Sequence, residues 1–250
     1  MSLPPESSPP ESSPPESPLT DASRSVPWKA WDLVLALVLG FVGGVVVVGV
    51  LLAFFPRLDD LETTRWLFFA GGTIYLFELF FAWLLVLKRR GATFRDVGLV
   101  RPSVGAVLLM IPAILGVFLV EGIVAQAVIN LFGPTPTAAD QLLGSEGVLD
   151  RTQIPWVVML TVIVAPIVEE IVFRGLLYGY LRSRMSIKIA APISALVFAC
   201  FHFIPLLIPS LFVLGIALAF VYERYKSIVV PMALHALNNG IVVWALYSGL

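Results

Sequence analysis

The sequence predicts an all-α fold, a polytopic bundle of transmembrane helices preceded by a disordered N-terminal tail. Of the 250 residues, 58% are hydrophobic and only 13% are charged, whereas a soluble domain carries about 25% charged residues. Apolar stretches long enough to cross a bilayer core of about 30 Å recur along the chain. The first residues instead repeat a Pro-Pro-Glu-Ser-Ser unit, and such a segment cannot bury a hydrophobic core.

About seven apolar stretches are expected to span the membrane, and eight spans is the alternative count. They are residues 33–55, 66–87, 104–132, 154–180, 189–203, 206–222 and 227–250. Pro205 and Pro209 mark the turn between the fifth and sixth spans, which nearly merge in hydropathy. The expected regions are a disordered tail (1–27), N-terminal transmembrane helices (28–132), an outer loop (133–153) and C-terminal helices (154–250).

The positions of lysine and arginine predict the orientation of these spans. If the N-terminus is cytoplasmic, 12 of the 16 basic residues fall in cytoplasmic segments. These residues are Arg24, Lys29, Lys88, Arg89, Arg90, Arg95, Arg101, Arg182, Arg184, Lys188, Arg224 and Lys226. We therefore expect an integral protein of the bacterial plasma membrane, with its N-terminus in the cytoplasm and its C-terminus outside.

Charge and cysteine content exclude several functions. A formal net charge of −1 gives no indication of nucleic-acid binding. The single cysteine, Cys200, excludes an internal disulfide and a cysteine-based zinc site within one chain. Because Cys200 lies in an apolar stretch, a packed hydrophobic residue is a better interpretation than a nucleophile.

The first polar cluster in the second half of the chain is Glu169-Glu170-Ile-Val-Phe-Arg174. On a helix, Glu170 and Arg174 share a face and can form an ion pair. Glu169 is rotated by about 100° from its neighbour and stays free of that pair. Ionisable residues inside a membrane helix indicate a functional site, although an ion pair that only supports packing is the alternative.

Two further clusters carry the histidines. Phe198 precedes His202 by four residues, so that an aromatic wall can lie against the imidazole ring. His235 and Asn239 have the same spacing and also share a helix face. For His235 and Asn239, the alternative is a structural role in hydrogen bonding between helices. For Asn238, that structural role is the favoured interpretation.

These clusters are expected to meet at a common depth. Counted from the nearest cytoplasmic basic residue, Glu169, His202 and Asn239 each lie roughly 20 Å along their helix, at about 1.5 Å per residue. Polar residues with separate structural roles would not be expected to lie at the same depth in the membrane. The spacing therefore predicts one site built from three separate spans.

Such a site can hydrolyse an amide with water as the nucleophile. Glu169 can take a proton from water, while the histidine and asparagine side chains stabilise an oxyanion. Alternatively, Glu169, His202 and His235 form a zinc site whose bound water is the nucleophile. The chain has no His-Glu-x-x-His stretch, and the residues alone leave both versions open.

The three clusters resemble the motifs EExxxR, FxxxH and HxxxN of the CPBP family, the CAAX-protease and bacteriocin-processing (Abi) peptidases. All three occur in order, over about residues 155–245. The resemblance implies a membrane-embedded endopeptidase, either a metalloendopeptidase or a glutamate peptidase, acting on a membrane-associated peptide or protein in the lipid bilayer. It implies catalytic roles for Glu169, His202, His235 and Asn239, and supporting roles for Glu170, Arg174 and Phe198.

Two alternatives come from other functional classes. Buried glutamate and histidine residues also build proton relays, so a proton-coupled transporter subunit is one alternative. The two halves of the chain show no internal repeat, which counts against it. A non-catalytic bacteriocin-immunity protein is the other. Glu78 and Glu121, in the first half, match no motif.

Overall fold

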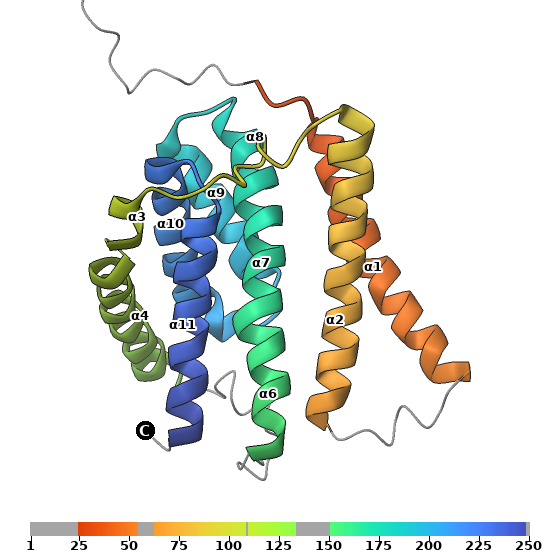
Figure 1. Cartoon of the computed structure of the whole chain (residues 1–250). Coiled ribbons are helices and arrows are strands. Elements are labelled where there is room, and N and C mark those ends of the chain that lie inside the picture. The colour runs from red at the N-terminus through yellow and green to blue at the C-terminus, as the bar shows by residue number, and fades with distance from the viewer. Residues whose placement is uncertain (1–24, 55–62, 109, 134–150, 249–250) are drawn as a thin grey trace, which may run out of the picture.

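The computed structural model describes residues 25–54, 63–108, 110–133 and 151–248, and these residues form a bundle of helices joined by turns (Figure 1). No strand occurs among them, which confirms the predicted all-α fold. Most of the predicted tail (residues 1–24) and of the predicted outer loop (residues 134–150) lies outside the described residues.

The helices of the described part follow the predicted order. They are α1 (Ala30–Phe54), α2 (Thr63–Phe81), α3 (Val104–Leu108), α4 (Met110–Phe132), α6 (Ile154–Val157), α7 (Ala165–Glu169), α8 (Gly179–Arg182), α9 (Ile187–Cys200), α10 (Ile208–Tyr225) and α11 (Val229–Ser248). Wider, π-helical turns occupy Ala82–Lys88, Val158–Val164 and Glu170–Tyr178, and short 3₁₀ turns occupy Arg151–Gln153 and Pro205–Leu207.

Five of these helical stretches are long and apolar enough to cross a membrane. They are Ala30–Phe54, Phe68–Lys88, Pro112–Phe132, Ile154–Arg182 and Pro205–Tyr225. Two shorter apolar helices, Ile187–Cys200 and Val229–Ala245, correspond to the remaining two predicted spans. All seven predicted apolar stretches are therefore helical and in the predicted order over the described residues, and five of them are long enough to cross a membrane.

The long helix from Ile154 to Arg182 carries the first motif and stands between α2 and α11 (Figure 1). Pro166, near the start of α7, has no N–H to donate and its ring crowds the carbonyl group one turn earlier. This accounts for the wide turns of Val158–Val164 immediately before α7. A second wide segment, Glu170–Tyr178, follows α7 without a break.

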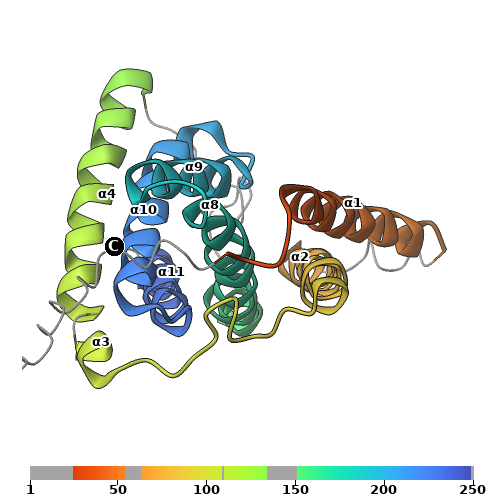
Figure 2. The same ribbon diagram turned by 90° about the horizontal axis from the view of Figure 1, so that it is seen from above.

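Helix α1 packs closely on α2, and the pair stands beside the remaining helices (Figure 2). Glycines on α1 make this close approach possible. A Cβ atom at Gly44 would lie 2.7 Å from the Cα atom of Ile74, and one at Gly40 would lie 2.7 Å from the Cα atom of Glu78. The backbone of α2 is therefore held directly against that of α1.

The hydrophobic core surrounds the middle of the long helix. Its buried members come from four other helical regions as well: Ile114, Val117, Val168, Val172, Phe173, Phe198, Leu214, Leu218 and Leu234. Helices α9 and α10 approach closely at Gly215, where a Cβ atom would lie 2.9 Å from the Cα atom of Ala195. The motifs on the long helix, α9 and α11 are thus fixed around one core.

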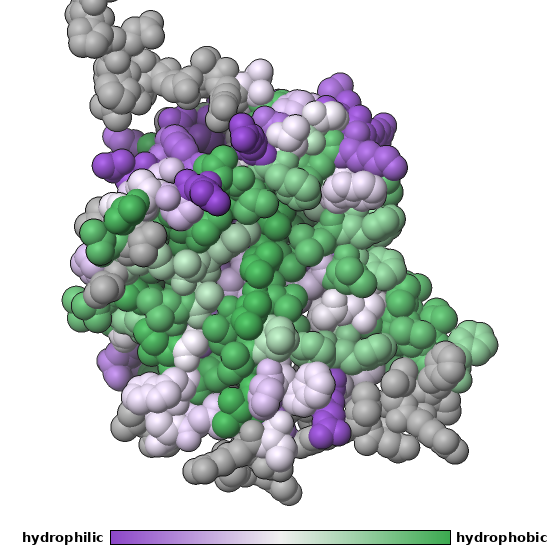
Figure 3. Space-filling view, in the orientation of Figure 1, coloured by the Kyte–Doolittle hydropathy of each residue, from purple (hydrophilic) through white to green (hydrophobic). Residues whose placement is uncertain are grey.

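The surface shows a broad hydrophobic band below a hydrophilic rim (Figure 3). Residues from three predicted cytoplasmic segments line one depression: Arg95, Arg101, Arg182 and Lys226. Near the start of α1, Asp32 pairs with Arg90 at 2.7 Å. These predicted cytoplasmic segments therefore gather at one side of the bundle, while α11 ends at the opposite side (Figure 1).

Candidate active site

Glu169 and Glu170 lie in the long helix where α7 gives way to the wide turns of Glu170–Tyr178. Their residues are 8% and 0% exposed. A carboxylate removed from water in this way needs hydrogen-bond or charge partners. Wide helical turns are frequent at functional sites, and here they begin at the two acidic residues.

Glu170 is held from two sides through its Oε1 atom. Arg174 donates to this oxygen from Nη1 at 2.8 Å, as the four-residue spacing predicts. The Nδ1 atom of His235 lies 3.0 Å from the same oxygen. Arg174 also donates from Nη2 to the carbonyl oxygen of Gly215 at 3.3 Å. The ion pair on the long helix is thus tied to both α10 and α11.

Glu169 stays outside that ion pair and faces α11 and α2. Its Oε2 atom lies 3.8 Å from Nε2 of His235, and its Oε1 atom accepts a hydrogen bond of 2.6 Å from the hydroxyl of Tyr75. Oε2 is buried and has no hydrogen-bond partner within the described residues. Tyr75 was not identified from the sequence, because it lies 94 residues before Glu169 in a region without a recognised motif.

His202 lies just beyond the end of α9, which stops at Cys200 rather than continuing to residue 203 as predicted. Its Nδ1 atom is 2.9 Å from the carbonyl oxygen of Phe198. Because a carbonyl oxygen only accepts, this contact places a proton on Nδ1. The predicted turn at Pro205 is present as a short 3₁₀ helix. The helix therefore ends two residues before His202, which lies in the turn that leads to Pro205.

Phe198 is fully buried and stands between the two histidines. Its ring centroid lies 4.9 Å from that of His202 and 5.7 Å from that of His235, in edge-to-face arrangements. The guanidinium of Arg174 lies 4.4 Å from the same ring centroid. The aromatic wall predicted for one histidine thus contacts both histidine rings.

Asn239 is engaged with the backbone of the long helix. Its Nδ2 atom donates to the carbonyl oxygen of Thr161 at 2.8 Å, in the wide turns of Val158–Val164. An amide nitrogen has two N–H groups, so the second remains available. The neighbouring Asn238 is buried, and its Oδ1 atom has no hydrogen-bond partner in the described part of the chain.

The structure thus joins most of the predicted residues through direct contacts. These are Glu169, Glu170, Arg174, Phe198, His202 and His235. Asn239 follows His235 by one turn of α11, and its side chain donates to the backbone of the long helix at Thr161. Three separate spans therefore contribute to one buried cluster.

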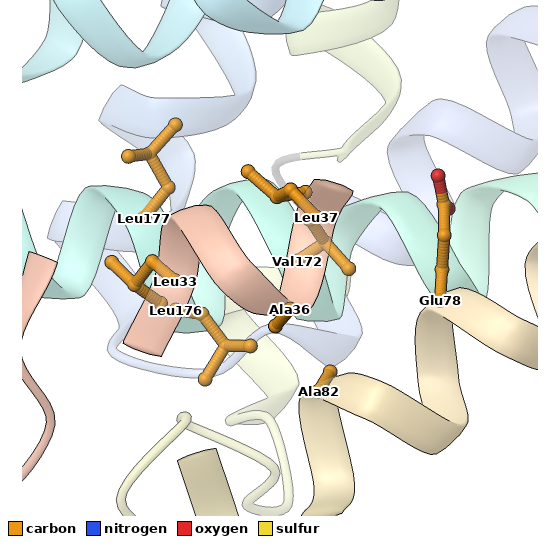
Figure 4. Close-up of a pocket in the computed structure, with 8 residues that line it drawn as sticks. All are labelled: Leu33, Ala36, Leu37, Glu78, Ala82, Val172, Leu176 and Leu177. Atoms are coloured by element: carbon orange, nitrogen blue, oxygen red, sulfur yellow. The ribbon is translucent and has the colours of Figure 1, made fainter. Parts of the chain in front are cut away.

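Two further carboxylates lie near this cluster. Glu121 on α4 interacts electrostatically with His235, and Glu78 on α2 interacts with Glu169. Glu78 borders a narrow, mainly apolar pocket between α1, α2 and the long helix, and its side chain extends toward the long helix (Figure 4). Both acids that matched no motif are therefore close enough to influence the site.

Glu169, His202 and His235 are residue types that bind zinc, but their arrangement is not that of a zinc site. Two imidazoles and one carboxylate are a known zinc ligand set. In the described part of the chain, however, no three histidine, cysteine, aspartate or glutamate side chains are grouped so that they could hold a metal ion. The arrangement of Glu169, His202 and His235 therefore does not fit a metal.

Oε2 of Glu169 and Nε2 of His235 lie 3.8 Å apart, so a water molecule bound beside this pair would be within hydrogen-bond reach of both atoms. A water lying beside the line from Oε2 to Nε2 can be within about 2.8 Å of both atoms. Nδ1 of His235 carries a proton and donates it in a hydrogen bond to Glu170. In a neutral ring the other nitrogen, Nε2, is therefore unprotonated. The arrangement can therefore remove a proton from water.

The region that contains these motifs matches a known family. Residues 151–241 match the family model described as type II CAAX prenyl endopeptidase, Rce1-like. The predicted resemblance to the CAAX-protease family is therefore confirmed over this region.

Two bacterial relatives carry related names. YdiL of Bacillus subtilis (strain 168), named as a membrane peptidase, is 33% identical over 100 residues, which cover 40% of this chain and 41% of YdiL. MroQ of Staphylococcus aureus (strain USA300), named as a membrane-embedded CAAX protease, is 26% identical over 204 residues, 76% of this chain and 78% of MroQ. The chain thus spans less than half the length of YdiL.

No solved structure matches the chain. The apolar helices and these relatives identify an integral membrane protein.

Proposed function

We propose that the chain is an intramembrane endopeptidase in which Glu169 activates a water molecule to hydrolyse a peptide bond. One observation carries this proposal. The buried Oε2 atom of Glu169, without a hydrogen-bond partner among the described residues, lies 3.8 Å from Nε2 of His235. A free carboxylate oxygen in a dry site beside an imidazole is the arrangement that general-base catalysis needs.

The reaction follows from these two side chains. Glu169 Oε2 takes a proton from water as the water oxygen forms a bond with the carbonyl carbon of the substrate. The electron pair of the carbonyl moves onto its oxygen. When that pair returns, the C–N bond breaks and the proton on Glu169 passes to the leaving nitrogen. The carboxylate is then restored for the next cycle.

The oxyanion needs hydrogen-bond donors, and three side chains can supply them. Asn239 has a second N–H beside the one donated to Thr161. His202 and His235 each hold a proton on Nδ1, so each donates from Nε2 only when its ring carries a second proton. The two histidines can therefore alternate between accepting a proton and stabilising the oxyanion.

The substrate of this reaction is a peptide or protein segment that reaches the bilayer, because the site is surrounded by apolar helices. The relatives named as a membrane peptidase and a CAAX protease support this class of substrate. The proposed reaction uses water bound by side chains alone, and the lack of a suitable group of metal ligands among the described residues supports this version. We expect cleavage to persist in the presence of 1,10-phenanthroline, and inhibition reversed by added Zn²⁺ would contradict the metal-free reaction.

The test compares cells that produce the wild-type chain with cells that produce Glu169→Gln. Mass spectrometry of membrane peptides should find cleavage products that fall by about 10²- to 10⁴-fold in the variant, the usual contribution of a general base. Asp96→Asn, which makes the same change in the exposed loop between α2 and α3, should leave the products unchanged. Equal products from wild type and Glu169→Gln, with equal membrane insertion, would instead favour a non-catalytic protein such as an immunity protein.

The proposed orientation places the basic rim in the cytoplasm and the end of α11 outside. It rests on the excess of basic residues at one side of the bundle and on the opposite position of the C-terminal helix end (Figure 1). Alkaline phosphatase fused after Leu250 should be active, because this reporter works only outside the cytoplasm. An inactive phosphatase and a fluorescent cytoplasmic reporter at the same position would reverse the assignment.

A further inference from the structure

Tyr75, on α2, donates a hydrogen bond of 2.6 Å from its hydroxyl to Oε1 of Glu169. A donor to a carboxylate at this distance is in the range of strong, charge-assisted hydrogen bonds. Tyr75 lies outside residues 151–241, the region that matches the family model. The contact therefore connects the first half of the chain to the proposed active site.

We propose that Tyr75 is a positioning residue that selects which oxygen of Glu169 receives the proton from water. This inference rests on the proposed function. The Tyr75 hydroxyl occupies Oε1, so the incoming proton goes to Oε2. Oε2 is the oxygen that faces Nε2 of His235, where the water and the substrate carbonyl meet. Tyr75 thus makes the two carboxylate oxygens unequal and keeps the reactive one directed at the substrate.

The position of Tyr75 is fixed by packing rather than by the hydrogen bond alone. Helix α2 runs beside the long helix, and the ring centroids of Phe68 and Trp156 lie 5.1 Å apart. One turn further along, a Cβ atom at Gly71 would lie 3.1 Å from Cδ2 of Leu160. Tyr75 follows Gly71 by another turn on the same face. The tyrosine side chain also packs against the hydrophobic core.

A preorganised donor of this kind affects the chemical step more than substrate binding. Glu169 without its Tyr75 partner can rotate, and its two oxygens become interchangeable. Loss of alignment of a reacting group lowers the rate of the chemical step, while contacts to the rest of the substrate persist. A purely structural role for Tyr75 would instead reduce the amount of folded protein and leave the kcat of that folded fraction unchanged.

The kinetic test uses Tyr75→Phe, which removes only the hydroxyl, and a quenched fluorescent peptide ending in a prenylated CAAX sequence. We expect kcat, per folded enzyme, to fall about tenfold with KM within twofold of wild type. Tyr247→Phe is the matched control, because the buried Tyr247 hydroxyl has no hydrogen-bond partner among the described residues. A Tyr75→Phe enzyme with wild-type kcat would overturn the positioning role.

A second measurement keeps this inference separate from the proposed function. In thermal unfolding of the detergent-solubilised chain, Tyr75→Phe should lower the midpoint by about 3–6 °C in the wild-type background. In a Glu169→Leu background, where no acceptor remains, the same change should leave the midpoint unaltered. If wild type cleaves no peptide but this coupling is present, the proposed function fails and the contact stands. If the two changes act independently, the inference about Tyr75 is wrong.

Discussion

The Nδ1 atom of His235 lies 3.0 Å from Oε1 of Glu170, the same oxygen that accepts the hydrogen bond from Arg174. One buried oxygen therefore orients an imidazole and neutralises a guanidinium. Because Glu170 holds the proton of His235 on Nδ1, the other ring nitrogen is directed at Glu169. The two adjacent glutamates thus have different contacts: Glu170 aligns the histidine, and Glu169 faces the ring nitrogen beside which we propose that water is activated.

Glu170→Gln should destabilise the fold strongly. Arg174 is 1% exposed, and it would lose its buried counter-charge, a change that costs about 3–5 kcal/mol in comparable pairs. Thermal unfolding in detergent measures the effect. Glu223→Gln is the control, because its partners Arg182 and Lys226 are partly exposed and such pairs contribute about 1 kcal/mol or less. Similar losses for both variants would contradict the assignment of Glu170 as a buried anchor.

His202→Ala should reduce cleavage by about 10²-fold or more while the protein still inserts and folds. In the proposed reaction the imidazole supplies a donor or acceptor, and its removal also leaves the Phe198 carbonyl without this partner. Peptide cleavage per folded enzyme is the measurement. Cys200 is exposed, and its interpretation as a packed residue was therefore wrong. Cys200→Ala, two residues before His202, should retain activity. Loss of activity in Cys200→Ala would point to a thiol nucleophile and against activated water.

Asn239→Ala should lower kcat by about 10²- to 10³-fold, the usual effect of losing one oxyanion donor. It also removes the contact to Thr161, so stability should be recorded alongside the kinetics. Asn238→Ala provides the comparison, since the buried Oδ1 of Asn238 has no hydrogen-bond partner in the described chain. Equal kcat values for the two variants would show that neither amide acts on the oxyanion.

Gly44→Ala should separate α1 from α2 and weaken the bundle. A Cβ atom there would lie 2.7 Å from the Cα atom of Ile74, so backbone must shift, and overpacking of this kind costs about 1–3 kcal/mol. Ile74 precedes Tyr75, so activity should fall together with stability. At Gly49 on the same helix, nothing lies within 4 Å of the added methyl group. Gly49→Ala should therefore have the stability and activity of the wild type. A loss of stability in both variants would indicate that α1 tolerates no substitution of glycine, whatever its contacts.

Much of the fold could be predicted because the bilayer imposes a length on apolar helices. Hydropathy located all seven apolar helices of the described part, and the turn at Pro205 was expected from proline chemistry. Local detail was harder to predict. The end of α9 at Cys200 and the wide turns beginning at Glu170 depend on tertiary packing, which periodicity does not record.

The same division applies to the candidate site. Four-residue spacing predicted the Glu170–Arg174 pair and the ring contact between Phe198 and His202, since both depend on one helix or its end. The shared depth of three spans also follows from counting residues. The assignment of these residues as catalytic remains a prediction, which the substitutions above test.

Contacts between distant segments could not be predicted in this way. Tyr75 reaches Glu169 across 94 residues, and Asn239 bonds a backbone carbonyl of Thr161 that no side-chain motif marks. The positions of Glu78 and Glu121 beside the site likewise depend on how α2 and α4 pack. A single sequence carries no signal for such pairings.

The buried ring of Phe198 has a practical consequence, because it touches both histidines and the guanidinium of Arg174. A fluorine atom introduced on this ring would sense the electric field of all three neighbours. Its NMR signal would record protonation of either imidazole in the intact protein, before any substrate is known.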